Sequence, residues 1–104
     1  MNTLVRSNGN NQIVKTVQQH QCLFSSFDRV YLFGSSLEKD RVPNDVDILL
    51  VYSTDSKNTM NNIDDISRVL EKELYLPIHL TILSSNELVE TGFLRKIAKY
   101  QRIL

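Results

Sequence analysis

The chain has 104 residues, and its 12 basic and 12 acidic side chains give a formal net charge of zero at pH 7. This length is that of one ordinary domain, and the balanced charge argues against a scaffold that binds nucleic acid through a basic surface. The single cysteine, Cys22, excludes an intramolecular disulfide, and no apolar run approaches the roughly 20 residues that span a bilayer. These features predict a cytoplasmic protein with no membrane contact, and the zero net charge leaves homo-oligomerisation open.

The first residues predict a flexible N-terminus over 1–10 and a single domain over 11–104. The stretch up to Asn11 is polar, rich in asparagine and without the apolar core of a secretory signal. Over residues 12–27 the apolar side chains recur at intervals that suit one face of a helix, with a polar gap at 18–21. The apolar positions of this predicted helix are Ile13, Val14, Val17, Leu23, Phe24 and Phe27.

Two predicted strands follow, separated by a polar segment. Arg29–Phe33 is rich in β-branched, aromatic and aliphatic residues and stops at Gly34. Residues 35–44 are polar and contain Pro43, which disfavours a regular element there. Val46–Tyr52 includes a continuous apolar run, which indicates a strand buried on both faces.

A loop over 53–58 leads into the most regular helical pattern of the chain. Its apolar residues repeat at intervals of three and four, as on one face of an amphipathic helix, and are Ile63, Ile66, Leu70 and Leu74. We expect this helix to reach about Tyr75, because Pro77 cannot continue it. The next apolar stretch, 78–83, predicts a third strand.

The last part of the chain predicts a helical region that begins with a capping box. Ser84 and Glu87 have the spacing of that motif, in which each side chain binds the backbone of the other residue. Gly92 interrupts the region, and a second helical part carries the basic residues Arg95, Lys96, Lys99 and Arg102. The predicted order is therefore α-β-β-α-β-α, a small α+β domain with helices packed against a mixed sheet.

Between Gly34 and Asp47 the sequence combines the features of a phosphate site and a metal site. Gly34 and Ser35 directly follow a predicted strand, where glycine lets the backbone approach a ligand and the next turn can present N–H groups to phosphate oxygens. Asp45 and Asp47 flank one apolar residue at the start of the next strand, so both carboxylates project from the same face. Two adjacent carboxylates are costly without a compensating cation, and Mg²⁺ prefers such oxygen ligands.

The stretch YLFGSSLEKDRVPNDVDILLVY, residues 31–52, resembles the signature of the DNA polymerase β-like nucleotidyltransferases. That signature is a hydrophobic strand, Gly-Ser, a spacer and then Asp-hydrophobic-Asp in the next strand. The similarity is strongest to the minimal nucleotidyltransferases (MNT), small antitoxin-like domains often encoded beside a helical HEPN partner. The similarity is sharp over about a fifth of the chain, and the order of the flanking elements extends it more weakly to most of the rest.

The resemblance implies a role for each residue of the motif. Asp45 and Asp47 would bind Mg²⁺ and serve as the catalytic carboxylates. The phosphates of a nucleoside triphosphate, ATP before others, would lie at the glycine turn. By this resemblance, the nucleotide-binding residues are Gly34 and Ser35, and Ser36 is an additional candidate. Lys39, in the spacer, could also reach triphosphate oxygens, or it solubilises the spacer beside Glu38 and Asp40.

The same resemblance predicts a third carboxylate in the strand after the long helix, but this chain has His79 at the matching position. The third carboxylate of the family helps to hold a second metal ion and activates the attacking hydroxyl, so the sequence leaves a two-ion site open. Imidazole is a poor Mg²⁺ ligand, although its ordinary pKa of about 6.5 suits a catalytic general base. His79 is also consistent with a polar residue at a strand surface that takes no part in chemistry.

Three functions remain open on the sequence. In the first, the protein is an enzyme resembling protein adenylyltransferases, which transfers a nucleoside monophosphate from Mg·NTP to a hydroxyl acceptor, one candidate being a HEPN-type toxin. In the second, favoured by His79, it is a nucleotide-binding module of the same fold that masks or steadies its partner with little or no transfer. In the third, it is a plain interaction domain, and the acidic pair is coincidental.

Overall fold

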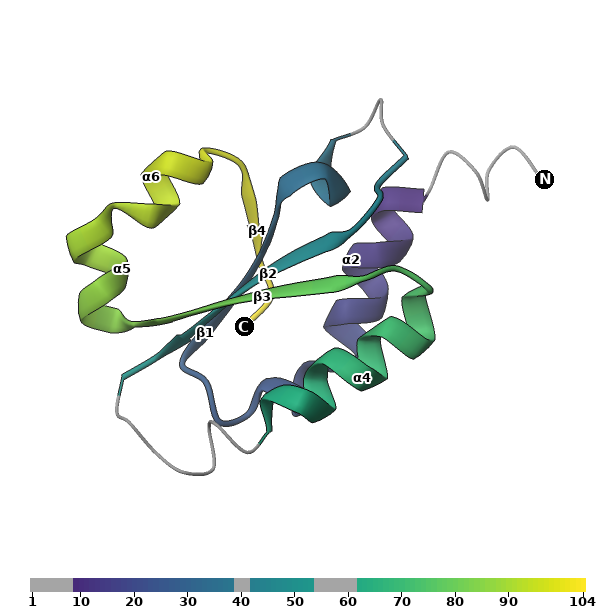
Figure 1. The fold of residues 1–104 in the computed structure, drawn as a ribbon, viewed down its shortest axis with the longest axis horizontal. Helices are drawn as coiled ribbons and strands as arrows, with labels where there is room; N and C mark the ends of the chain where they lie inside the picture. Colours follow the sequence, from purple (N-terminus) through teal and green to yellow (C-terminus); the bar gives the residue numbers. More distant parts are fainter. Residues whose placement is uncertain (1–8, 39–41, 54–61) are drawn as a thin grey trace.

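The computed structural model describes residues 9–38, 42–53 and 62–104 (Figure 1), so Lys39 and most of the predicted loop 53–58 lie outside the described residues. The helices are α2 (Gly9–Gln19), α4 (Ile63–Leu74), α5 (Ser85–Thr91) and α6 (Phe93–Ile97), and two 3-10 helices are η1 (Gln21–Phe24) and η2 (Gly34–Leu37). The strands are β1 (Arg29–Phe33), β2 (Val46–Tyr52), β3 (Ile78–Ser84) and β4 (Tyr100–Arg102). Among the described residues, no helix has both the length and the apolar composition needed to cross a bilayer.

The four strands form one mixed sheet in the order β3-β2-β1-β4 (Figure 1). β1 pairs antiparallel with both β2 and β4, whereas β2 and β3 run parallel. A parallel pair needs a crossover connection, and α4 lies in the connection between these two strands. The mixed sheet packed against helices confirms the predicted α+β fold, and the predicted bounds of β1 and β2 are confirmed.

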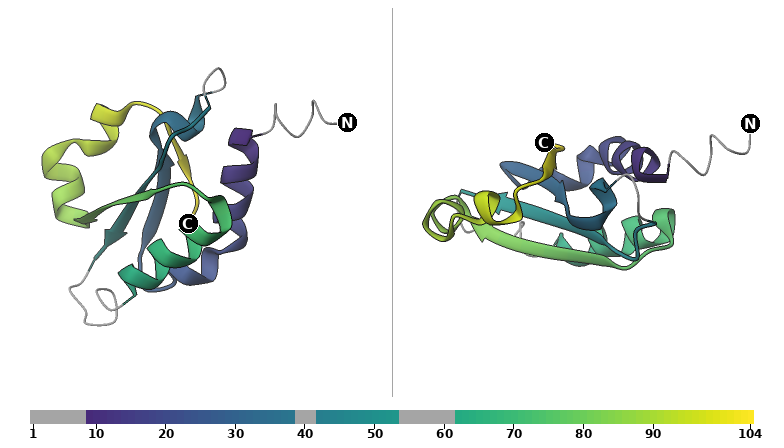
Figure 2. Two further views of the ribbon diagram at one scale, coloured as in Figure 1. Left: turned by 45° about the vertical axis from the view of Figure 1, so that its right-hand side comes forward. Right: turned by 90° about the horizontal axis from the view of Figure 1, so that it is seen from above.

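One face of the sheet is closed by α2, η1 and α4. The apolar cluster on this closed face has 13 buried members, among them Ile66 and Leu70 of α4. The strands contribute every second residue to it: Val30, Leu32, Val46, Ile48, Leu50 and Ile78. Figure 2 shows α2 and α4 close together against the same part of the sheet. This cluster is therefore the main core of the domain.

The opposite face, which we call the open face, is only partly covered. It carries the other alternate residues of the strands, including Tyr31, Phe33, Asp47, Leu49 and His79. Its buried cluster has four members, Tyr31, Leu49, Val51 and Leu88, with Phe93 and Leu94 of α6 packed against them. In Figures 1 and 2, α5 and α6 lie at the end of the sheet opposite to α2 and α4. At the N-terminal ends of β2 and β3, this face carries the polar side chains of Asp47 and His79.

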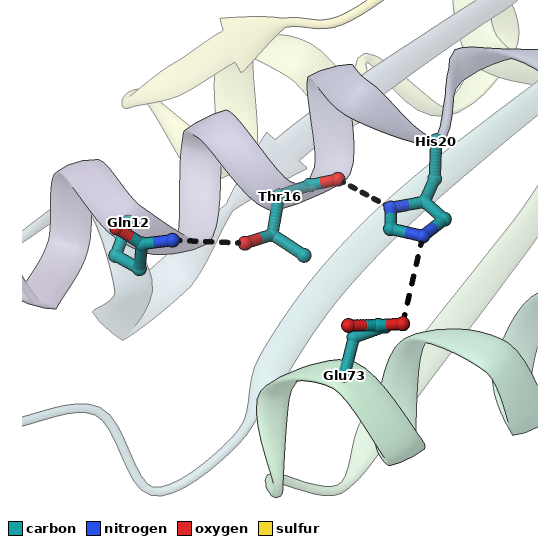
Figure 3. Close-up of polar contacts among 4 residues, drawn as sticks. All are labelled: Gln12, Thr16, His20 and Glu73. Carbon is teal, nitrogen blue, oxygen red and sulfur yellow. Dashed lines mark hydrogen bonds and ion pairs between the residues drawn. The ribbon is translucent and has the colours of Figure 1, made fainter.

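The first predicted helix is divided in the structure. The prediction of one continuous helix over 12–27 is wrong. His20, which lies in the polar gap, has φ −103° and ψ 25°, and these non-helical angles end α2. His20 Nδ1 lies 2.8 Å from Thr16 O, and its Nε2 lies 4.0 Å from Glu73 Oε1 on α4 (Figure 3). The imidazole thus satisfies a carbonyl near the end of α2 and turns toward α4. α2 also begins at Gly9, inside the segment predicted to be flexible.

Local signals set the ends of α4 and α5 as predicted. Tyr75 ends α4 in the left-handed conformation, and Pro77 follows it. Both halves of the capping box form at α5, where Glu87 N donates to Ser84 Oγ at 3.0 Å and Ser84 N donates to Glu87 Oε1 at 2.9 Å. Gly92 then separates α5 from α6 with φ 62°. These side-chain and backbone preferences act over only a few residues, so the sequence alone specifies them.

The C-terminal segment differs from the predicted basic helix. α6 ends at Ile97, and the following residues form β4, an edge strand that pairs with β1. Ile103 is buried in the main apolar cluster directly after β4. Lys99 and Arg102 therefore lie outside the helix, because pairing with β1 and burial of Ile103 outweigh the local helical preference. The observed order has a fourth strand after the last helix, which the predicted order α-β-β-α-β-α lacks.

Candidate functional site

Asp47 is the second residue of β2 and lies on the open face of the sheet, and Asp45 directly precedes this strand. Val46, between them, is fully buried in the main apolar cluster, so the two aspartates that flank it project to the opposite side. Asp47 pairs with Phe33 of β1 on one side and with His79 of β3 on the other. The structure thus brings both predicted carboxylates and the predicted third residue to one end of one sheet face.

The turn at Gly34 lies directly against Asp47. Gly34 follows β1 and begins η2 with φ 82°, a left-handed conformation that favours glycine. A Cβ built on Gly34 would overlap Asp47 Oδ2 and would lie 3.3 Å from its Cγ. Glycine is therefore required both by the backbone conformation and by the carboxylate packed against the turn.

The two serines after Gly34 have different environments. Ser35 is partly exposed, so its hydroxyl can meet a ligand at the turn. Ser36 is fully buried, and its Oγ donates to Phe33 O at 3.3 Å. The Ser36 side chain therefore stabilises the turn from inside and does not present its hydroxyl to solvent.

His79 lies beside the first aspartate. Its Nε2 is 3.4 Å from Asp45 Oδ2, and 60% of the His79 side chain and 38% of the Asp45 side chain are exposed. A contact this exposed adds little stability. Because both side chains are partly exposed, both are accessible to a ligand.

The donor set fits one magnesium ion better than two. Mg²⁺ bound with a nucleotide takes one or two protein carboxylates and completes its octahedron with phosphate oxygens and water, which Asp45 and Asp47 would allow. Within the described ranges, no three histidine, cysteine or acidic side chains are arranged to hold one metal ion. The carboxylate pair therefore suits a cation that arrives with its own phosphate ligands.

The pKa of Asp47 reflects the unfavourable placement of two carboxylates side by side. Burial raises the pKa of the Asp47 carboxyl above its ordinary value of 3.8, the neighbouring Asp45 raises this pKa further, and His79 lowers it. Both raising effects disfavour the charged form of the group. A cation shared by the two carboxylates would remove their mutual repulsion, so the geometry favours cation binding.

The open face also carries an aromatic residue that the sequence pattern did not single out. Tyr100 of β4 pairs with Phe33, so only β1 separates it from Asp47. The available signal was the alternation of Tyr100 and Arg102 before the apolar Ile103. Three residues are too few to distinguish an edge strand from the frayed end of a helix.

Comparison with known proteins adds evidence on the fold. No protein-family model matches the sequence, and no curated protein matches it. One similar solved structure is a proposed nucleotidyltransferase from Sulfolobus solfataricus, with 15% identity, a TM-score of 0.51, and coverage of 91% of this chain and 82% of that chain. Another belongs to the complex of a tri-AMPylated Shewanella oneidensis HEPN toxin with an MNT antitoxin, with 15% identity, a TM-score of 0.51, and coverage of 100% of this chain and 72% of that chain. This chain has a nucleotidyltransferase-like fold.

The nucleotidyltransferase-like fold agrees with the motif at residues 31–52. At 15% identity the two similarities concern the fold, and they carry no information on the substrate of this chain. A function therefore has to be argued from the site itself, from the carboxylate pair, the Gly34 turn and His79.

Proposed function

We propose that this protein binds a magnesium–nucleoside triphosphate complex, ATP before others, and transfers its nucleotidyl group to a hydroxyl on a partner protein. The observation that carries this proposal is the packing of Asp47 against the Gly34 turn, with Asp45 on the same face. A nucleotidyl transfer site needs carboxylates for a cation and a backbone turn for phosphates, and here they are adjacent. The nucleotidyltransferase-like fold supports the same assignment.

In this proposal the phosphates lie on the turn and the cation lies on the carboxylates. The left-handed Gly34 lets the turn lie against Asp47, and Ser35 would supply a hydroxyl and a backbone N–H to the phosphates. Asp45 and Asp47 would hold Mg²⁺, which would supply positive charge to the phosphates as the transferred group reacts. The pair of aspartates thereby fixes where the α-phosphate sits.

Transfer requires one bond to form and one to break at the α-phosphorus. The acceptor oxygen would bond to this phosphorus, the bond to the bridging oxygen would break, and pyrophosphate would leave. The proton of the acceptor hydroxyl needs a base, and His79 is exposed and adjacent to Asp45, which can orient the imidazole. His79 would therefore accept this proton at one ring nitrogen.

The partner we propose is a HEPN-type toxin, which would make this chain an antitoxin. In the similar complex from Shewanella oneidensis, the HEPN toxin is tri-AMPylated and bound to an MNT antitoxin. A nucleotidyl group transferred by the present chain would correspondingly modify a hydroxyl side chain of its partner, such as a tyrosine.

His79 also supports a second function, that of a nucleotide-binding module with weak or absent transfer. The imidazole is a poor substitute for a carboxylate as an Mg²⁺ ligand, so a second ion would lack a ligand that the family supplies. Such a module would bind Mg·ATP through Asp45 and Asp47 and would act by masking or steadying its partner.

Transfer is tested with α-labelled ATP, Mg²⁺ and the protein encoded by the adjacent reading frame. We expect label on that partner, loss of label with the double variant Asp45→Asn/Asp47→Asn, and full label with Asp64→Asn/Asp65→Asn. The second pair is a matched control because its carboxylates are exposed on α4, away from the open face.

Calorimetry with Mg·ATP separates the two functions. Binding that depends on Asp45 and Asp47, without label on any acceptor, leaves the module function. If the wild type and the Asp45→Asn/Asp47→Asn variant bind Mg·ATP equally, both nucleotide functions are wrong. In the transfer assay, His79→Asp tests the missing ligand: a gain in transfer indicates a lost carboxylate, and a loss indicates that the imidazole has a role.

A further inference from the structure

Tyr100 lies on the open face beside the Gly34 turn. It pairs with Phe33, the residue before that turn, and Phe33 pairs on its other side with Asp47. Because neighbouring strands are about 4.8 Å apart, two strand spacings place the Tyr100 and Asp47 Cα atoms roughly 10 Å apart. The start of the phosphate turn is therefore flanked by a carboxylate on one side and an aromatic ring on the other.

The Tyr100 ring is anchored but accessible. It packs edge-to-face against Tyr31, with ring centroids 5.4 Å apart and an angle of 84° between the ring planes. Tyr31 is only 5% exposed, whereas Tyr100 is 44% exposed. An aromatic ring that is already held by a buried neighbour loses little conformational freedom when a flat ligand packs on it.

A strained turn at Ala98 precedes β4 and sets the position of Tyr100. Ala98, between α6 and β4, has φ 64° and ψ −51°, and Lys99 N donates to Ile97 O at 2.6 Å. These angles are those of the strained γ-turn, which is rare. Residues other than glycine hold such a conformation only where the surrounding structure enforces it, and such sites cluster near functional groups. The turn redirects the chain so that Tyr100 enters β4 opposite Phe33.

The charge around Tyr100 suits a polyphosphate ligand. The segment 95–102 contains four basic residues and no acidic residue, although the whole chain is neutral. Lys99 is exposed next to Tyr100. Arg102, also exposed, projects from the same side of β4 as Tyr100, and its Nε donates to Leu104 O at 3.1 Å. A nucleotide at the turn would therefore meet positive potential on the side away from the carboxylates.

We infer that Tyr100 is a stacking platform for the base of a nucleoside triphosphate whose phosphates lie at the Gly34 turn. This inference rests on the proposed function and adds the residue that recognises the base. Every base has a flat face that can stack on a tyrosine, so the platform accepts all four nucleotides and favours the larger purine rings. Tyr100 is a binding residue in this scheme, with no part in moving the proton.

A comparison of two ligands tests the platform, because one of them lacks the base. Calorimetry measures the binding of Mg·ATP and of Mg·tripolyphosphate to the wild type, Tyr100→Phe and Tyr100→Ala, with the fold of each variant checked by circular dichroism. We expect Tyr100→Ala to weaken Mg·ATP binding about 5- to 150-fold, the range that stacking on one aromatic side chain supplies. Tyr100→Phe keeps the ring and should bind within about twofold of the wild type, and tripolyphosphate affinity should not change.

A tryptophan at the same position reports stacking directly. The chain contains no tryptophan, so Tyr100→Trp introduces a single fluorophore, and we expect Mg·ATP but not Mg·tripolyphosphate to quench it. The matched control is Tyr75→Trp, because Tyr75 is 88% exposed at the end of α4, away from the open face. Its fluorescence should not respond to either ligand.

The outcomes separate this inference from the proposed function. If Mg·ATP binding depends on Asp45 and Asp47 but is unchanged in Tyr100→Ala, the platform is wrong and the nucleotide function stands. The platform is also wrong if Tyr100→Ala weakens tripolyphosphate and ATP equally, or if Tyr100→Trp does not respond to Mg·ATP. If the wild type binds neither ligand, the proposed function is wrong, and the platform is wrong with it.

Discussion

The two faces of the sheet differ in what the same strands present to them. On the closed face, Ile48 and Leu50 of β2 are fully buried beneath α2 and α4. On the open face, Asp47 of the same strand lies beside the Gly34 turn and stays partly exposed. Alternate residues of one strand thus form the core on the closed face and the polar site on the open face. The apolar packing on the closed face compensates for the unfavourable carboxylate pair on the open face.

The open face contains several features that lower stability and that a purely structural surface would not need. Asp47 is partly buried beside a second carboxylate, and Ala98, in the turn before β4, has a positive φ. The closed face is built on the main apolar cluster, whose 13 buried members supply the compensating apolar burial. If this division is correct, substitutions in the main apolar cluster change stability, and substitutions of the exposed polar residues on the open face mainly change binding.

The largest expected effect is on the closed face. Leu50→Ala removes a fully buried side chain from the main core, and we expect a loss of about 2–5 kcal/mol in the free energy of unfolding, measured in urea. Thr81→Ala, a partly exposed position on the open face, serves as the control and should cost less than about 1 kcal/mol. Equal losses at the two positions would contradict the division between a core face and a site face.

The next effect separates two glycines that both have a positive φ. Gly34→Ala and Gly92→Ala each place a Cβ on a left-handed residue, which costs about 1–2 kcal/mol of unfolding free energy. Only at Gly34 does the new Cβ meet Asp47, since no atom lies within 4 Å at Gly92. We expect both variants to be destabilised in urea and only Gly34→Ala to lose Mg·ATP binding in calorimetry. Retention of binding by Gly34→Ala would show that the turn and the carboxylate do not share a ligand.

The smallest effect is a gain in stability on the open face. Because the folded state raises the pKa of Asp47 above 3.8, it binds a proton that the unfolded state releases, so stability falls as pH rises through this window. Asp47→Asn has no ionisable group at this position, so its stability does not show this decrease with pH. In the absence of divalent ions we expect the variant to match the wild type near pH 3 and to be slightly more stable at pH 7, because the group is partly exposed.

Urea unfolding at a series of pH values measures this gain, and Asp64→Asn on the exposed first turn of α4 provides the control. A variant at Asp47 that is less stable than the wild type at pH 7 would contradict the electrostatic account of the site.

Features with local signals could be predicted from the sequence. Gly34 ends β1, Pro77 follows α4, and the Ser84 and Glu87 pair begins α5, because each depends on residues only a few positions apart. The break at His20 was not predicted, since it depends on a contact with Thr16 and a partner on α4. β4 was missed for a related reason, because three residues form a strand only when β1 pairs with them.

The candidate site divides in the same way. The closeness of Gly34 and Asp47 follows from two neighbouring strands joined by a short spacer, which the motif contains. The burial of Ser36 does not follow, because it depends on the 3-10 turn that directs this side chain inward. Tyr100 could not be predicted beside the site, since it reaches the open face through the strained turn at Ala98 and the unpredicted β4.

Paramagnetic relaxation by Mn²⁺ in the presence of ATP tests most directly whether the carboxylate pair and the Gly34 turn share a cation. We predict that the amide signals of Gly34, Ser35, Asp45 and Asp47 broaden at the lowest Mn²⁺ concentrations, ahead of those of α4, and that Asp45→Asn/Asp47→Asn abolishes this broadening. Broadening centred on another acidic surface, or unchanged in the double variant, would contradict the account.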